Sequence, residues 1–248
     1  MSSRVISVIT AVHAPMADLL QDAYASLVKQ ELPSGWKWEW LVQEDSLDGQ
    51  IAKLLPVDKR IKFGSGKPGG PGVARTVALA RATGELVKVL DADDQLTAGA
   101  LARDIALLTE RPEVGWTTSR VLDLLPDGTQ ISWKHQDPEE GPIARRSIVD
   151  FWLNNEHRLP VHPATLCIRR QLLLALGGWM ALPASEDTGL LLAANVLSDG
   201  YFIEEPGLLY RKWSGQTTMQ ATFIDEEARV HRTRIVEDRA RALLALMG

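Results

Sequence analysis

Leu86-Val87-Lys88-Val89-Leu90-Asp91-Ala92-Asp93-Asp94 is the stretch of sequence that decides the fold. Its apolar beginning predicts a buried strand, and its end presents three carboxylates within four residues. Carboxylates at this density repel one another, so they persist where a cation or a positively charged group offsets them. In an open α/β sheet, ligands bind beyond the carboxyl ends of the strands. The stretch therefore predicts a site for a divalent metal that carries a phosphate. The alternative is an Asp-rich turn that only caps the next helix.

Alternating strand and helix patterns surround this stretch, and such alternation predicts a parallel sheet with crossover helices. Trp36, Trp38 and Trp40 share one face of the second strand, and we interpret them as core packing and not as a sugar platform. The predicted strands of the first half cover residues 5–10, 36–42, 57–63 and 85–90, and its predicted helices cover residues 16–30, 72–83 and 97–109.

The pattern changes after Pro112, where Pro126-Asp127-Gly128-Thr129 predicts a hairpin turn and therefore a mixed sheet. The chain is thus predicted to form one α/β domain, with a mostly parallel sheet flanked by helices and a mixed second half. The predicted strands of this half cover residues 114–125, 130–133, 164–168 and 201–210, its predicted helices cover residues 147–155, 170–176, 185–198 and 225–247, and residues 136–142 are predicted to form a polar loop.

The composition of the 248 residues is that of an ordinary globular protein, with 45% hydrophobic and 24% charged residues. A net charge of -5 leaves no basic footprint for nucleic acid. Cys167 is the single cysteine, so no internal disulfide can form, and we expect a reducing, cytoplasmic environment. No apolar run approaches the roughly 18 to 20 residues of a membrane span, and we expect no leader before the first strand. We therefore expect no integral membrane segment.

Five motifs occur in an order that resembles the family 2 glycosyltransferases, which have the GT-A fold. The motifs are Val5-Ile6-Ser7-Val8-Ile9-Thr10-Ala11-Val12-His13, Trp40-Leu41-Val42-Gln43-Glu44-Asp45-Ser46-Leu47-Asp48-Gly49, Gly69-Gly70-Pro71-Gly72-Val73-Ala74-Arg75, Leu90-Asp91-Ala92-Asp93-Asp94 and Glu186-Asp187. The resemblance implies an inverting enzyme that takes a sugar from a nucleotide-diphosphate sugar, with a UDP-sugar as the leading donor. It divides the single domain 1–248 into a nucleotide-sugar-binding half (4–112), an acceptor-side half (113–215) and a C-terminal helical extension (216–248).

The resemblance assigns the donor to the first half of the chain. Thr10 and Val12 stand where the family receives the nucleotide base after the first strand, and Glu44 is the carboxylate expected to recognise that base. Asp91 is expected to face the ribose or the sugar. Arg75 follows a flexible Gly-Pro-Gly turn, so its planar fork can pair with the diphosphate or the donor sugar. A solvated helix residue is the alternative for Arg75.

Metal and base are the two remaining roles that the chemistry requires. Loss of the diphosphate builds negative charge on the leaving oxygens, which a divalent cation stabilises. The resemblance implies that Asp93 holds this cation, and oxygen ligands fit Mg²⁺ or Mn²⁺. It also implies that Asp187 is the general base that accepts the proton of the acceptor hydroxyl, with Glu186 orienting the acceptor. The alternative for Asp187 is an acid that only caps a helix N-terminus, and the alternative for Glu186 is a solvated side chain.

Three positions depart from the family pattern. Gln43 stands where the family has the first of two acids, and Thr76 replaces the Asn that follows the arginine. Trp213 occupies a place where relatives carry a His that helps to hold the metal. Metal coordination is therefore expected from Asp93, the diphosphate and water.

Two alternative functions share some of these features. A sugar-phosphate nucleotidyltransferase also binds nucleotides on an α/β core, but it needs a glycine-rich loop with Arg and Lys after the first strand, where this chain has Ala11-Val12-His13-Ala14-Pro15. A non-catalytic nucleotide- or carbohydrate-binding domain would not need Asp91, Asp93 and Asp187. The expected partners are a nucleotide-sugar donor, a small-molecule or glycan acceptor and a second copy of the chain in a homodimer.

Overall fold

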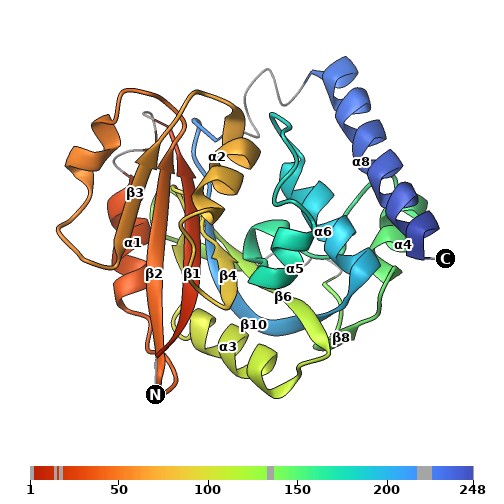
Figure 1. Cartoon of the computed structure of the whole chain (residues 1–248), viewed down its shortest axis with the longest axis horizontal. Helices are drawn as coiled ribbons and strands as arrows, with labels where there is room; N and C mark the ends of the chain where they lie inside the picture. Colours follow the sequence, from red (N-terminus) through yellow and green to blue (C-terminus); the bar gives the residue numbers. More distant parts are fainter. Residues whose placement is uncertain (1–2, 14–15, 17–18, 133–136, 217–224, 248) are drawn as a thin grey trace.

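A ten-stranded mixed sheet forms the centre of the protein in the computed structural model, which describes residues 3–13, 16, 19–132, 137–216 and 225–247. Strands β1 to β4 lie side by side in one half of the molecule, and α4, α6 and α8 gather in the other half (Figure 1). The strands are β1 Arg4–Val12, β2 Trp36–Glu44, β3 Ile61–Ser65, β4 Leu86–Val89, β5 Gln95–Leu96, β6 Val114–Leu124, β7 Gln130–Ser132, β8 Gly141–Ile143, β9 Cys167–Arg169 and β10 Asp199–Arg211. The helices are α1 Leu20–Val28, α2 Gly70–Leu79, α3 Ala100–Glu110, α4 Ser147–Asn154, α5 Arg170–Ala175, α6 Glu186–Leu197 and α8 Glu226–Met247, with short 3₁₀ turns at Gln50–Leu54 and Pro163–Thr165.

The strand order is β3-β2-β1-β4-β9-β6-β10-β5, with β7 paired to β6 and β8 paired to β10. The first four strands are parallel, and β9 is antiparallel to both β4 and β6. This arrangement confirms a single α/β domain with a mixed second half. Because β1, β2 and β4 are parallel neighbours, their carboxyl ends meet at one edge of the sheet, and the polar residues that follow them are brought together there.

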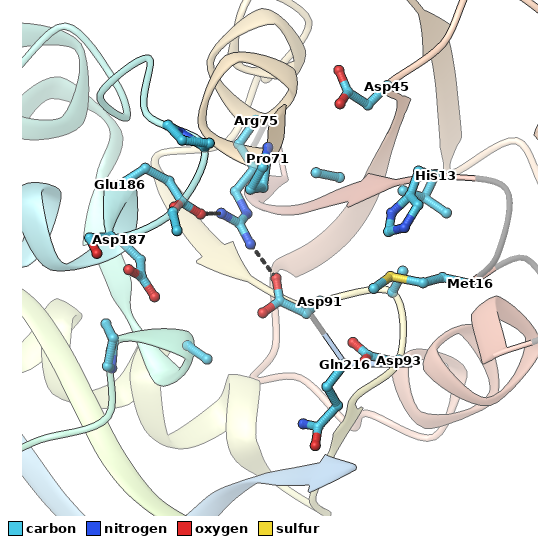
Figure 2. A pocket seen from close by; sticks show the side chains of 18 of the residues that line it. His13, Met16, Asp45, Pro71, Arg75, Asp91, Asp93, Glu186, Asp187 and Gln216 are labelled. Atoms are coloured by element: carbon cyan, nitrogen blue, oxygen red, sulfur yellow. Dashed lines mark hydrogen bonds and ion pairs between the residues drawn. The ribbon is translucent and has the colours of Figure 1, made fainter. Parts of the chain in front are cut away.

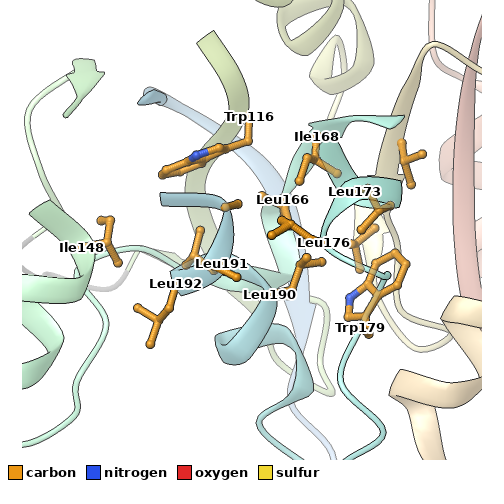
Figure 3. Close-up of a cluster of buried hydrophobic side chains, with 14 of the residues drawn as sticks. Trp116, Ile148, Leu166, Ile168, Leu173, Leu176, Trp179, Leu190, Leu191 and Leu192 are labelled. Carbon is orange, nitrogen blue, oxygen red and sulfur yellow. The ribbon is translucent and has the colours of Figure 1, made fainter. Parts of the chain in front are cut away.

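Apolar side chains bury both faces of this sheet. Along β1, Ile6 and Val8 belong to a cluster with α1 and α3, whereas Ile9 belongs to a second cluster that contains α2 and α6. Leu190 and Leu191 of α6 are fully buried in the second cluster beside the β-strands (Figure 3). A helix that is apolar on nearly all sides must lie in the interior. Consequently α6 carries its two N-terminal acids into the molecule.

The tryptophans of β2 serve core packing, as predicted: Trp38 and Trp40 are buried, and Trp36 is half-buried against the same cluster. Trp40 is fully buried and stacks on Tyr24 with ring centroids 5.7 Å apart, and Trp38 is 5% exposed. The Arg60 guanidinium lies 3.6 Å from the centre of the Trp38 ring. These contacts leave no open indole face on these two residues for a sugar.

Lys88 is the charged residue inside β4, and it is 1% exposed. Its ammonium group donates to Asp104 Oδ2 at 2.8 Å and to the Thr165 carbonyl at 2.6 Å. Asp104 accepts a further bond from the Thr117 hydroxyl at 2.7 Å. A buried charge with partners of this kind is tolerated. The pair therefore fastens α3 and the segment before β9 to the central strand.

Several predicted boundaries were wrong. The third strand covers Ile61–Ser65 instead of residues 57–63, and α2 begins at Gly70 and ends at Leu79 instead of covering residues 72–83. The end of the predicted polar loop 136–142 enters strand β8, which pairs with β10, and β5 was missed. Strands of two or three residues have too few positions for a periodic signal, and only their pairing with β10 creates them. Residues 17, 18, 133 and 136 of the predicted segments lie outside the described part of the chain.

The described helices include none that is both long and apolar enough to cross a membrane.

Candidate active site

A cavity of about 600 Å³ opens beyond the carboxyl ends of β1 and β4. Figure 2 shows its walls: residues after β1 and β2 lie on one side, the start of α6 lies on the other, and the turn after β4 lies between them. Six of the predicted site residues line it together. These residues are Val12, Arg75, Asp91, Asp93, Glu186 and Asp187.

The turn after β4 presents its three carboxylates differently. Asp91 is partly exposed and faces the cavity, and Asp93 is 9% exposed and also lines it. Burial and the neighbouring Asp91 charge raise the pKa of Asp93 above its usual value. Asp94 is 1% exposed and does not line the cavity, and its Oδ1 accepts the backbone N–H of Arg211 at 2.9 Å. Asp94 therefore holds β10 in place, and Asp91 and Asp93 are the two carboxylates available to a ligand.

Arg75 projects from α2 into the centre of the site and joins the two walls. Its Nη2 donates to Asp91 Oδ1 at 2.5 Å and its Nη1 donates to Glu186 Oε1 at 2.6 Å (Figure 2). Burial lowers the pKa of Arg75, but the Asp91 and Glu186 charges outweigh it and leave the pKa above its usual value. Arg75 is 6% exposed, so the predicted alternative of a solvated helix residue is wrong. Its two terminal nitrogens are bound to protein carboxylates.

Gly72 permits this approach of α6 to α2. A Cβ atom at Gly72 would lie 2.2 Å from the Met180 carbonyl oxygen and 2.9 Å from Cβ of Glu186. No side chain fits in that space, so the segment before α6 packs directly on the backbone of α2. The glycine thereby lets Glu186 reach Arg75.

The two acids at the start of α6 follow a residue in the left-handed region. Ser185 has φ 65° and ψ 11°, which costs a non-glycine residue about 1–3 kcal/mol and is found most often at functional sites. Glu186 is 5% exposed, whereas Asp187 accepts the backbone N–H of Thr188 at 2.6 Å on one oxygen and lines the cavity. Burial raises the pKa of Asp187. A carboxylate with a raised pKa is a stronger base than an exposed one.

Glu186 makes the stability of the protein depend on pH. Burial and the adjacent Asp187 charge outweigh the attraction of Arg75 and raise the pKa of Glu186 from 4.5 to about 7. The folded state therefore binds a proton that the unfolded state has released between these pH values. This contribution to stability is fully present below about pH 4.5 and is lost as the pH rises through 7.

We expect the Glu186→Gln variant to lose this part of the pH dependence. The free energy of unfolding of the wild type should fall by on the order of 2 kcal/mol relative to the variant between pH 4.5 and pH 8. Urea unfolding at several pH values measures the difference, and Glu31→Gln, which changes an exposed glutamate, is the control. Parallel curves for wild type and Glu186→Gln would show that Glu186 does not titrate in this range.

Two of the predicted donor-binding residues lie outside the cavity wall. Thr10 is fully buried, and its hydroxyl donates to the Leu90 carbonyl at 2.6 Å and accepts the Trp40 indole N–H at 2.8 Å. Glu44 is 2% exposed and accepts the Ser46 hydroxyl and the backbone N–H of Ile51. Their positions give both residues structural roles, because they bond elements of the first half to each other.

Asp45 is a site residue that the sequence analysis missed. It lines the cavity, and its two oxygens accept the backbone N–H groups of Gly69 at 2.8 Å and Gly70 at 2.9 Å. The glycine-rich segment before α2 therefore directs these amides to a protein carboxylate. The available signal was a third consecutive polar residue, Asp45, directly after Gln43 and Glu44 at the end of a predicted strand. Other residues that enter the cavity wall without having been predicted are His13, Met16, His162, Tyr210 and Gln216.

Trp213 makes a direct contact with the predicted metal ligand. Its indole Nε1 donates to Asp93 Oδ2 at 2.8 Å. Within the described parts of the chain, no group of three His, Cys, Asp or Glu side chains is placed to hold a metal ion. Asp91 and Asp93 nevertheless fit a Mg²⁺ or Mn²⁺ ion that carries a phosphate, because such ions need only one or two carboxylates beside phosphate and water.

Comparisons with known proteins identify the family and the fold. The family model "Glycosyl transferase family 2" matches residues 7–170. Solved structures of S. aureus TarS have the same fold. TarS 1–349 in complex with UDP-GlcNAc has a TM-score of 0.72 and 20% identity over 97% of this chain and 70% of that chain. TarS 1–349 in complex with UDP has a TM-score of 0.66 and 18% identity over 97% of this chain and 69% of that chain.

A longer structure of S. aureus TarS has a TM-score of 0.67 and 18% identity over 97% of this chain and 42% of that chain. No curated protein matched the sequence. The fold, the arrangement of the cavity and a family model that spans well over half of the chain agree, and this protein is a glycosyltransferase that belongs to glycosyl transferase family 2.

Proposed function

We propose that the protein moves a sugar from a nucleotide-diphosphate sugar to an acceptor hydroxyl, with a divalent metal and with inversion at the anomeric carbon. One observation carries the proposal: two sets of carboxylates line the same cavity, Asp91 and Asp93 after β4 and Glu186 and Asp187 at the start of α6. The first set suits a donor with its cation, and the second suits an acceptor. The TarS structures contain UDP-GlcNAc and UDP, which supports a UDP-sugar as the donor.

The charge of the cavity supports a metal ion. Its described wall contains five carboxylates and one guanidinium, which Arg75 supplies. A diphosphate would be repelled from such a wall unless a cation accompanied it. Asp93 and Asp91 would hold Mg²⁺ or Mn²⁺ through oxygen atoms, and the ion would stabilise the charge that develops on the leaving diphosphate.

Asp187 is placed to act on the acceptor. In the proposed reaction its carboxylate accepts the proton of the acceptor hydroxyl while the hydroxyl oxygen forms a bond to the anomeric carbon. The bond from that carbon to the diphosphate oxygen breaks, and the diphosphate takes the electron pair. Arg75 holds Asp91 and Glu186 in fixed positions on either side of this reaction.

The buried free Cys167 is compatible with a reducing compartment, so we place the reaction in the cytoplasm.

We expect UDP to bind about 10- to 100-fold more tightly in the presence of Mn²⁺ than in EDTA, because the cation neutralises the cavity and couples the binding of the diphosphate to its own. Calorimetric titration with UDP under both conditions measures the effect. Asp93→Ala should fold and should lose the Mn²⁺-dependent part of the affinity. Asp238→Ala, which removes an exposed acid of α8, should keep it. Equal affinity in Mn²⁺ and in EDTA for the wild type would contradict the metal dependence.

The donor reaction distinguishes the proposal from its two alternatives. A glycosyltransferase should release UDP from a UDP-sugar, slowly with water and faster with an acceptor. A nucleotidyltransferase would instead release pyrophosphate from a nucleoside triphosphate and a sugar 1-phosphate. A non-catalytic binding domain would bind the UDP-sugar and leave it intact.

A further inference from the structure

The indole of Trp213 lies behind the carboxylate that is proposed to hold the metal. Its Nε1 donates to Asp93 Oδ2 at 2.8 Å. An indole has one N–H donor and no nitrogen lone pair in the ring plane, so it cannot become a ligand of a cation. A cation placed at Oδ2 would also approach the positive end of the N–H bond. Oδ1 of Asp93 is therefore the oxygen that remains for a metal.

Trp213 is held firmly in this position. The preceding β10 residue Arg211 donates from its Nε to the Asp93 carbonyl at 2.8 Å and from its backbone N–H to Asp94 Oδ1 at 2.9 Å. A Cβ atom at Gly215 would lie 2.1 Å from the Trp213 ring, so the Gly215 backbone packs directly on the indole. The end of β10 thus fixes both the backbone and the side chain of the acidic turn.

Few carboxylate oxygens remain for a cation. Oδ1 of Asp91 is paired with Arg75, and Oδ2 of Asp93 is paired with Trp213. Asp94 is buried away from the cavity. Among the described residues, the turn therefore offers one oxygen of Asp91 and one of Asp93. Two single oxygens leave most positions of an octahedral ion to phosphate and water.

We propose that Trp213 is a positioning residue that turns Asp93 toward the cavity and closes the place of a third protein ligand, so that the protein takes up the cation together with the donor diphosphate. The proposal rests on the metal dependence proposed above. It differs from that proposal because it predicts the order of binding and assigns it to one side chain.

Titration with Mn²⁺, followed by the electron paramagnetic resonance signal of the free ion, tests this proposal on the full chain. The wild type should bind Mn²⁺ with UDP present and should not bind it detectably without UDP at micromolar concentrations. Trp213→Phe keeps an aromatic ring but removes the N–H donor, and its affinity for Mn²⁺ in the UDP complex should fall by about 10- to 100-fold. Trp36→Phe, which changes a tryptophan outside the cavity wall, should match the wild type.

Trp213→His tests whether the indole closes the place of a third protein ligand of the cation. The imidazole corresponds to the five-membered ring of the indole and carries a nitrogen lone pair, so this variant should bind Mn²⁺ without UDP. Far-ultraviolet circular dichroism and the thermal midpoint establish that each variant is folded.

Tight binding of Mn²⁺ to the wild type without UDP would overturn the proposed order. Wild-type affinity in folded Trp213→Phe would overturn the positioning role, and absence of free Mn²⁺ binding in folded Trp213→His would overturn the closed position. The results with the two Trp213 variants leave the dependence of UDP affinity on Mn²⁺ in the wild type unchanged, and the calorimetric experiment measures that dependence separately. In the wild type the two titrations must agree, because each ligand raises the affinity for the other by the same factor.

Discussion

Asp187→Asn is expected to lower the rate of sugar transfer by about 10²- to 10⁴-fold, the range for loss of a general base. Asparagine keeps the shape of the side chain, and its oxygen can still accept the Thr188 N–H that Asp187 Oδ1 accepts at 2.6 Å. It cannot accept the proton of the acceptor. UDP affinity should change little, because the nucleotide is expected at the other wall of the cavity. The measurements are UDP release from a UDP-sugar, with water and with acceptors, and UDP affinity on the same variant.

Asp150→Asn is a matched control for this experiment. Asp150 lies in the first turn of α4, as Asp187 lies in the first turn of α6, but it is exposed and outside the cavity wall. This variant measures the effect of removing a negative charge near a helix N-terminus. The interaction of such a charge with the helix dipole contributes about 0.3–1 kcal/mol to stability. Near-normal transfer by Asp187→Asn would reduce Asp187 to that role and would move the base to Glu186 or favour a retaining mechanism.

The second large effect is expected at Arg75, where Arg75→Met should lower the free energy of unfolding by about 3–5 kcal/mol. Methionine occupies a similar volume but leaves the buried Glu186 and the partly exposed Asp91 without their cation. The sequence had suggested that Arg75 contacts the donor directly. The structure directs both of its terminal nitrogens to protein carboxylates, so we now expect its removal to act first on stability.

Urea unfolding of four proteins measures this effect: the wild type, Arg75→Met, Glu186→Gln and the double variant. The double variant should be less destabilised than the sum of the two single variants, because each removes the charge that the other leaves unpaired. Arg158→Met removes an exposed ion pair with Glu156 and should cost less than about 1 kcal/mol. Full stability with lost UDP affinity in Arg75→Met would show instead that Arg75 binds the donor.

Local sequence patterns were sufficient for most of the fold. The apolar run 86–90 predicted β4, because a strand buried on both faces is apolar almost throughout. The alternation of residues 36–42 predicted β2. The acids after β4 stand out because they follow a buried strand. The acids at the start of α6 stand out because they begin a buried helix. Once the strands are parallel, their carboxyl ends must meet, and the carboxylates of Asp91 and Asp93 reach one edge of the sheet.

Tertiary structure alone decided how these groups are paired. Arg75 and Glu186 are 111 positions apart, and Asp93 and Trp213 are 120 positions apart. No local pattern encodes such contacts, which depend on how closely α6 and the end of β10 approach the sheet. Thr10 and Glu44 show the same limit. A motif gives the place of a residue along a strand, but it does not show whether the polar group of the side chain already makes a hydrogen bond within the protein. The sequence thus determined which chemical groups come to this edge of the sheet, and packing over long separations decided which of their atoms stay available to a ligand.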